Sequence, residues 1–191
     1  LFGDTPFESE KVEQVVMKVT YPVTQLTFIQ LFKLMINYYK KMIIGFVLLT
    51  LLPLLVDTSW LMMSYIFKFH VIFFGGLMLS FVIHEYLHLF CLKNSKKTGN
   101  VEIEFTIFKI SIHPKFQLTS KEIIKVALVP IITLPLIGFL LIFLAALTNQ
   151  KFLKFTGYLY VFHIINIMPP LGDGMMILKT IFEKKKSLER R

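Results

Sequence analysis

Four stretches of the chain are long, apolar and almost free of charged residues: residues 42–56, 71–92, 126–148 and 152–178. Runs of this kind predict transmembrane helices. The first is the shortest, with 15 residues. As a helix it would rise only about 22 Å, which is less than the hydrocarbon thickness of roughly 30 Å. We therefore expect this span to thin the bilayer or to borrow neighbours such as Tyr38 and Tyr39.

Shorter elements are expected outside these spans. Residues 24–41 place apolar side chains at near-helical spacing among polar ones, which predicts a helix lying at the cytoplasmic interface. Residues 101–113 alternate imperfectly between apolar and polar side chains, which predicts one or two short strands. The pattern indicates an all-α integral membrane protein of about four transmembrane helices, with an interfacial N-terminal helix and a short β-like cytoplasmic insertion between spans two and three.

The third span carries signals at its start and in its interior. Thr119, followed three positions later by Glu122, predicts a helix cap with an early acidic residue. Pro130 and Pro135 predict a kink rather than a break, because neighbouring helices can satisfy the freed carbonyl groups. No repeat or Gly/Ser linker divides residues 1–191, so we expect a single membrane-embedded domain.

Composition and charge favour a membrane protein over a nucleic-acid-binding one. The chain is 55% hydrophobic with a mean hydropathy of +0.66, more apolar than ordinary soluble domains. Its 21 Lys and Arg residues fall before, between and after the four spans in groups of five, one, seven, two and six. This alternation predicts four spans with both termini cytoplasmic. The net charge of +9 is then explained by orientation and anionic lipid, and we expect no nucleic-acid partner.

The N-terminal residues lack the basic, apolar and small-residue pattern of a cleaved signal peptide. We therefore expect the first span to direct insertion.

The most informative motif is His84-Glu85-Tyr86-Leu87-His88, which lies inside the second span. Side chains at positions i and i+4 share one face of a helix, so His84 and His88 can bind a single Zn²⁺. Glu85 can then act as the base toward a water molecule at the metal. The alternative, that Glu85 is a protonated or paired residue holding helices together, is less favoured because ionisable residues inside membranes are costly.

A catalytic zinc site normally has three protein ligands, so a third is needed. Cys91 is nearest in sequence, but it lies about 10.5 Å of helical rise beyond His84. Asp173 is better placed, because Pro169, Pro170 and the flanking glycines should break the fourth span there. Broken backbone at membrane depth is tolerated where it lines a cavity.

The expected topology is consistent with that choice. The second and fourth spans run in the same direction if both termini are cytoplasmic. His88 lies five residues before Lys93, and Asp173 lies six before Lys179. Both candidate ligands therefore fall near the cytoplasmic ends of their spans.

Other polar residues are less directly linked to a metal site. His163, three residues before Asn166, could orient the active site, although we favour an interhelical hydrogen bond. By its chemistry Asn166 could assist the reaction or cap the broken helix. We expect His113, beside Pro114, to be a loop residue and His70 to lie at the membrane interface.

At these residues the chain resembles the site-2 protease group of membrane metallopeptidases, which pair a membrane-embedded HExxH with a later Asn-x-x-Pro…Asp-Gly segment. It resembles more closely the small bacterial membrane proteins described as putative zincin peptidases, over about residues 71–178. The resemblance implies that His84, His88 and Asp173 bind Zn²⁺, and that Asn166 lies near the reacting carbonyl. It also implies a bacterial cell membrane. One departure is that the chain reads Leu-Gly-Asp-Gly where the group usually has Leu-Asp-Gly, with one residue fewer between Asn and Asp.

The sequence therefore predicts a zinc-dependent endopeptidase with Glu85 and Asn166 as its catalytic residues. Its substrate would be a membrane protein or membrane-associated peptide, cut near the cytoplasmic face. Two alternatives stay open: a metal-ion carrier, and a catalytically inert membrane binding protein of the same fold.

Overall fold

Four apolar helical segments dominate the fold. The structure is a computed structural model that describes residues 17–95, 97–106, 110–168 and 172–189. Its elements are β1 (Met17–Pro22), α1 (Phe28–Leu51), η1 (Leu52–Leu55), α2 (Trp60–Val71), η2 (Ile72–Met78), α3 (Leu79–Asn94), β2 (Asn100–Phe105), β3 (Ile110–Pro114), α4 (Ser120–Thr148), α5 (Lys151–Phe162), η3 (His163–Ile167) and α6 (Gly172–Glu189). Within the described residues, the segments long and apolar enough to cross a membrane are Phe28–Leu55, Trp60–Asn94, Ser120–Thr148 and Lys151–Glu183. The expectation of about four such helices is confirmed.

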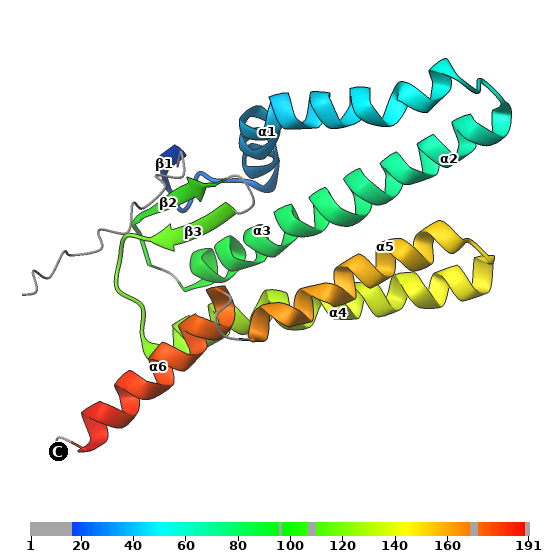
Figure 1. Cartoon of the computed structure of the whole chain (residues 1–191). Coiled ribbons are helices and arrows are strands. Elements are labelled where there is room, and N and C mark those ends of the chain that lie inside the picture. Colours follow the sequence, from blue (N-terminus) through cyan, green and yellow to red (C-terminus); the bar gives the residue numbers. More distant parts are fainter. Residues whose placement is uncertain (1–16, 96, 107–109, 169–171, 190–191) are drawn as a thin grey trace, which may run out of the picture.

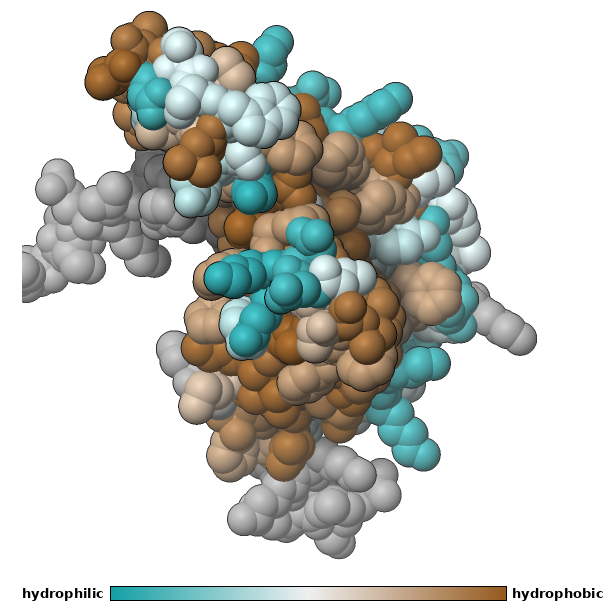
Figure 2. Space-filling view, turned by 90° about the vertical axis from the view of Figure 1, so that its right-hand side faces the viewer, coloured by the Kyte–Doolittle hydropathy of each residue, from teal (hydrophilic) through white to brown (hydrophobic). Residues whose placement is uncertain are grey.

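The helices form two hairpins that run along each other (Figure 1). The small sheet and α6 lie at one end of the molecule, and the turns from α1 to α2 and from α4 to α5 lie at the other. Figure 2 looks onto the end with the turns, where brown apolar surface surrounds small teal hydrophilic groups. The described start of the chain and its C-terminal helix are therefore at the same end.

The first two helical segments are longer than their apolar runs predicted. The expected interfacial helix and first span form one continuous helix, α1, whose first turns run at a steep angle to the rest (Figure 1). The second segment begins at Trp60 rather than at residue 71, because Lys68 and His70 interrupt the apolar run without ending the helix. His70 lies inside this segment and has Thr50 Oγ1 3.1 Å from its Nε2. A contact with a neighbouring helix therefore satisfies its imidazole.

A three-stranded antiparallel sheet of order β1-β2-β3 covers one side of α3. The one or two short strands expected between the second and third spans are present as β2 and β3, whereas β1 was not predicted. Val101, Ile103 and Phe105 on the inner face of β2 are fully buried against α1 and α3. Tyr39 adds a tie from α1, since its hydroxyl donates to the Thr106 carbonyl at 2.7 Å. This core fixes the half of α3 that carries the HExxH motif.

The outer face of the sheet is charged. Glu102 lies 3.9 Å from Lys18 on β1 and 2.8 Å from Lys115, which directly follows β3. The hydrogen bond from Lys115 holds the pKa of the Glu102 carboxyl below its usual value. This face therefore suits contact with water, while the opposite face packs on the helices.

The α4–α5 hairpin is closely packed. Thr119 and Glu122 form the expected cap of α4, and α4 runs unbroken through its two prolines. Gly138 and Gly157 meet where these helices cross, and a Cβ on Gly138 would come within 2.6 Å of the Gly157 carbonyl oxygen. After this hairpin the regular α-helix ends at Phe162 and resumes at Gly172. The predicted break at Pro169 and Pro170 lies outside the described residues.

Candidate metal centre

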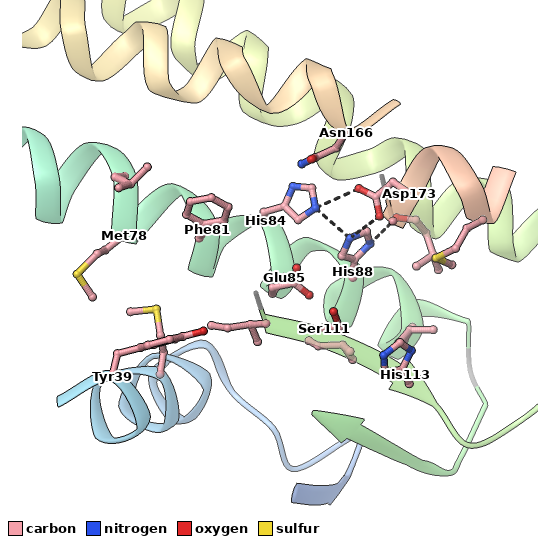
Figure 3. Close-up of a pocket in the computed structure, with 18 of the residues that line it drawn as sticks. Tyr39, Met78, Phe81, His84, Glu85, His88, Ser111, His113, Asn166 and Asp173 are labelled. Carbon is pink, nitrogen blue, oxygen red and sulfur yellow. Dashed lines mark hydrogen bonds and ion pairs between the residues drawn. The ribbon is translucent and has the colours of Figure 1, made fainter. Parts of the chain in front are cut away.

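Three side chains from two helices converge at the sheet end of the molecule. His84 Nε2 lies 3.1 Å from Asp173 Oδ2, His88 Nε2 lies 3.2 Å from Asp173 Oδ1, and the two Nε2 atoms are 3.2 Å apart. Both imidazoles come from α3, and the carboxylate comes from the first turn of α6 (Figure 3). Each of the three residues is at most 7% exposed. The structure thus brings together the three residues that the sequence pointed to.

The spacing of these atoms fits a small metal ion. A tetrahedral Zn²⁺ with bonds of about 2.0–2.1 Å holds its ligand atoms about 3.3 Å apart. Asp173 Oδ2 lies close to His84 yet has no well-aligned hydrogen bond, although it is buried. Buried carboxylate oxygens are normally hydrogen-bonded or bound to metal. The donor set, two imidazoles and a carboxylate, is one that zinc prefers.

The protein backbone sets the tautomer of His88. Its Nδ1 lies 2.9 Å from the carbonyl oxygen of Val126 on α4. Because a carbonyl only accepts, Nδ1 must carry the proton, and the lone pair of the neutral ring is then on Nε2. That atom faces Asp173 and His84. Hydrogen bonds of this kind typically orient metal-binding imidazoles.

Glu85 belongs to the same buried group. One ligand atom each of His84, Glu85 and His88 can be chosen so that all lie within 4.8 Å of one another. Glu85 is 8% exposed and lines the cavity described below. The arrangement can therefore hold a cation with a carboxylate beside it, as the HExxH spacing predicted.

A cavity of about 710 Å³ opens on this group. Its other walls come from α1, η2 and β3, and most of the lining is apolar. Figure 3 shows Tyr39 and Met78 on one side, and Ser111 and His113 of β3 below Glu85 and His88. Asn166 lines the cavity near His84. The space is large enough for a short segment of extended chain.

His163 makes the interhelical hydrogen bond that we favoured. Its Nε2 is 3.0 Å from Ser80 Oγ, and its ring stacks on that of His84 with centroids 5.1 Å apart. Asn166 Nδ2 lies 3.5 Å from His163 Nδ1. The sequence linked His163 to Asn166 by their spacing, but gave no signal that Ser80 was its partner.

Two other candidates lie outside the group. Cys91 is buried in the core beneath the sheet, among Leu89, Leu92 and their neighbours. His113, expected in a loop, lies on β3 and is exposed, with its Nε2 3.6 Å from Glu104. It belongs to the cavity wall and not to the group of three.

Sequence reasoning missed two parts of this site. The Val126 carbonyl is a backbone group, which carries no signal in the amino-acid sequence. Tyr39 was noted as a residue that could lengthen the first span, but it lies in the cavity wall. Its place follows from the bend of α1 toward the sheet, which hydrophobicity alone does not encode.

Comparison with known families supplies independent support. Residues 77–188 match a protein family described as "Putative zincin peptidase". This chain belongs to that family. The match covers more than half of the chain and includes the HExxH motif and Asp173. Comparisons with curated proteins and with solved structures gave no match. Membership of the zincin peptidase family indicates a zinc metallopeptidase, and the His84-Glu85-His88 group is a possible metal site in it.

Proposed function

We propose that this protein is a membrane-embedded zinc endopeptidase that hydrolyses peptide bonds in or beside membrane segments, near the cytoplasmic face. One observation carries the proposal: His84, His88 and Asp173 meet at 3.1–3.2 Å in a cavity that Glu85 also lines. A carrier would need a path for the ion through the protein, whereas these ligands form one cluster at one depth. The resemblance to site-2 proteases supports the same assignment.

The residues divide the chemistry among them. His84, His88 and Asp173 would hold Zn²⁺, which when bound supplies a Lewis acid and lowers the pKa of water. Glu85 accepts the proton of the attacking water and returns it to the leaving amine. The Asn166 amide, at the cavity wall, donates a hydrogen bond to the carbonyl oxygen as negative charge develops there.

A free strand edge supports a peptide as the substrate. Among the described residues β3 is the last strand of the sheet, and it lines the cavity. Lys115 N–H donates to the Asn100 carbonyl, and hydrogen-bonded pairs alternate along an antiparallel ladder. Ile112, which is paired with Ile103, must then direct its N–H and C=O away from β2. An extended peptide could use both groups.

The lengths of the helices support a position near the cytoplasmic face. Trp60–Asn94 has 35 residues and rises about 52 Å, more than the roughly 30 Å of a bilayer. If Trp60 lies at the outer interface, His84 and His88 lie about 36–42 Å along the helix and so near the inner interface. The same end carries the sheet and α6 (Figure 1). Together with the alternation of basic residues along the chain, this supports our proposal that both termini are cytoplasmic. The proposal of a bacterial cell membrane rests on the resemblance to the small bacterial membrane proteins.

The decisive experiment replaces Glu85 by Gln. The amide keeps the size of the side chain but cannot act as a base, so cleavage should fall by about 10²- to 10⁴-fold while zinc stays bound. Uncleaved membrane peptides should then accumulate on the purified variant. Glu104→Gln makes the same chemical change on the outer side of β2 and should cleave normally. Wild-type cleavage by Glu85→Gln would overturn the assignment, and metal flux into sealed vesicles would favour a carrier.

A further inference from the structure

His163 touches the candidate site from a different helical segment. It begins η3, is 5% exposed, and stacks on His84 with 24° between the ring planes. The Phe81 ring packs edge-on against the His163 imidazole, with ring centroids 5.1 Å apart. The His163 ring is therefore packed against α3, in contact with a candidate ligand.

The hydrogen bonds of His163 run in one direction. Ser80 Oγ donates to the Leu77 carbonyl at 2.8 Å, so its oxygen can only accept from His163 Nε2–H at 3.0 Å. The Nδ1 of a neutral His163 ring is then an acceptor. It faces the Asn166 amide nitrogen at 3.5 Å, a long hydrogen bond. This series of hydrogen bonds determines which way the Asn166 amide is turned.

The two candidate imidazole ligands are held differently. His88 is oriented by a hydrogen bond to the Val126 carbonyl. The Nδ1 of His84 is buried and has no hydrogen-bond partner among the described residues. Metal-bound imidazoles usually have such a partner, which fixes their orientation. For His84 the flat contact with His163 restricts rotation of the ring instead.

We propose that His163 is a positioning residue that holds the His84 ring for the metal and turns the Asn166 amide toward the cavity. The part of this inference that concerns Asn166 rests on the proposed function. The part that concerns His84 and the metal does not. Nothing in the reaction requires His163 to exchange a proton. The two roles can be tested separately, because His163 contacts His84 through the face of its ring and Asn166 through Nδ1.

The first test measures metal release. Detergent-purified protein would be loaded with Co²⁺, and loss of the ion to a chelator would be followed by its visible absorption. His163→Phe keeps a flat ring and should release the ion at about the wild-type rate. His163→Leu lacks the ring and should release it about 10- to 100-fold faster, the range found when outer partners of ligands are removed, with an altered Co²⁺ spectrum. Tyr160→Phe removes a part-buried hydrogen bond to the Gly75 carbonyl and should match the wild type.

The second test is a double-mutant cycle on cleavage. His163→Phe should lower kcat as much as Asn166→Ala does, and the double variant should be no slower than either. Independent, multiplying losses would refute the link to Asn166. Wild-type release and spectrum in His163→Leu would refute the link to His84. If the wild type binds Co²⁺ but cleaves no peptide, the proposed function fails, and the release rates still decide the role of His163.

Discussion

Gly174 lies directly against the carbonyl group of Ile167, so that a Cβ at Gly174 would overlap the carbonyl oxygen. The carbonyl carbon of Met168 would be only 3.0 Å from the same Cβ. The C-terminal end of η3 and the first turn of α6 are therefore in direct backbone contact. Asp173 precedes Gly174, so this contact sets where its carboxylate lies relative to His84 and His88.

Gly174→Ala should consequently disturb the metal centre without touching a ligand. The added methyl group meets backbone atoms that cannot rotate away, so α6 must shift and carry Asp173 with it. We expect the zinc content of the purified protein to fall by at least half, and cleavage to fall about 10-fold or more. Gly45→Ala is the matched control, because nothing lies within 4 Å of a Cβ built there. Full zinc occupancy in Gly174→Ala would show that α6 need not be held so closely.

The ligand assignment predicts the metal content of single variants. Purified protein should carry about one zinc per chain, and His84→Ala, His88→Ala and Asp173→Ala should each lower that content. Elemental analysis of the protein after dialysis provides the measurement. Removal of zinc with a chelator should abolish cleavage, and added Zn²⁺ should restore it.

Two variants serve as controls for that assignment. Cys91→Ala alters a buried core residue and His113→Ala an exposed one, and both should retain zinc. A loss in either as large as that of His88→Ala would mean that the ligand set is wrong. Full retention in Asp173→Ala would remove Asp173 from it.

The part of the site that the sequence predicted best depends on local geometry. His84 and His88 share a face because they are four residues apart on any helix. Asp173 could be chosen because prolines and glycines mark a break at the matching depth of another span. No local sequence pattern predicts the hydrogen bond from His88 to the Val126 carbonyl or the contact of His163 with Ser80. Both depend on how separate helices are oriented toward each other.

The fold shows the same division. β2 and β3 were predicted from alternation of side chains, but β1 pairs with residues far along the chain, Met17 with Phe105 and Pro22 with Asn100. A six-residue strand with one free edge gives little signal before its partner is known. The second helical segment was predicted too short because His70 and Lys68 are polar. Thr50 Oγ1 lies 3.1 Å from Nε2 of His70, and the Nζ atom of Lys68 lies 5.8 Å from the centre of the Tyr65 ring.

Membrane orientation can be tested by labelling in intact cells. In a Cys91→Ala background, Ser95→Cys and Ser187→Cys should be protected from an impermeant thiol reagent added outside. Gln150→Cys, in the turn between α4 and α5 at the opposite end of the molecule (Figure 1), should react. Labelling of Ser95→Cys from outside would invert the topology and require withdrawal of a cytoplasmic active site.

The free edge of β3 leads to a prediction about substrate binding. Because Ile112 directs its N–H away from β2, Ile112→Pro removes a donor that the sheet itself does not use. Proline is tolerated at such positions on edge strands, so the variant should fold and keep its zinc. Its melting temperature should fall only through the loss of the Ile112 side chain, which packs against the core. Loss of one backbone hydrogen bond to the substrate is worth about 0.5–1.5 kcal/mol, which corresponds to a fall of about two- to ten-fold in kcat/KM.

The control for this edge is Ile112→Val, which keeps the N–H and a β-branched side chain and should cleave at the wild-type rate. Comparing the two variants separates the backbone group from the side chain, since only the proline removes the donor. Cleavage of a membrane peptide by purified protein, with zinc content measured on the same samples, gives the ratio. If Ile112→Pro retains the wild-type kcat/KM and its zinc, the peptide backbone does not pair with β3. The substrate would then be held by the apolar wall of α1 and η2 alone.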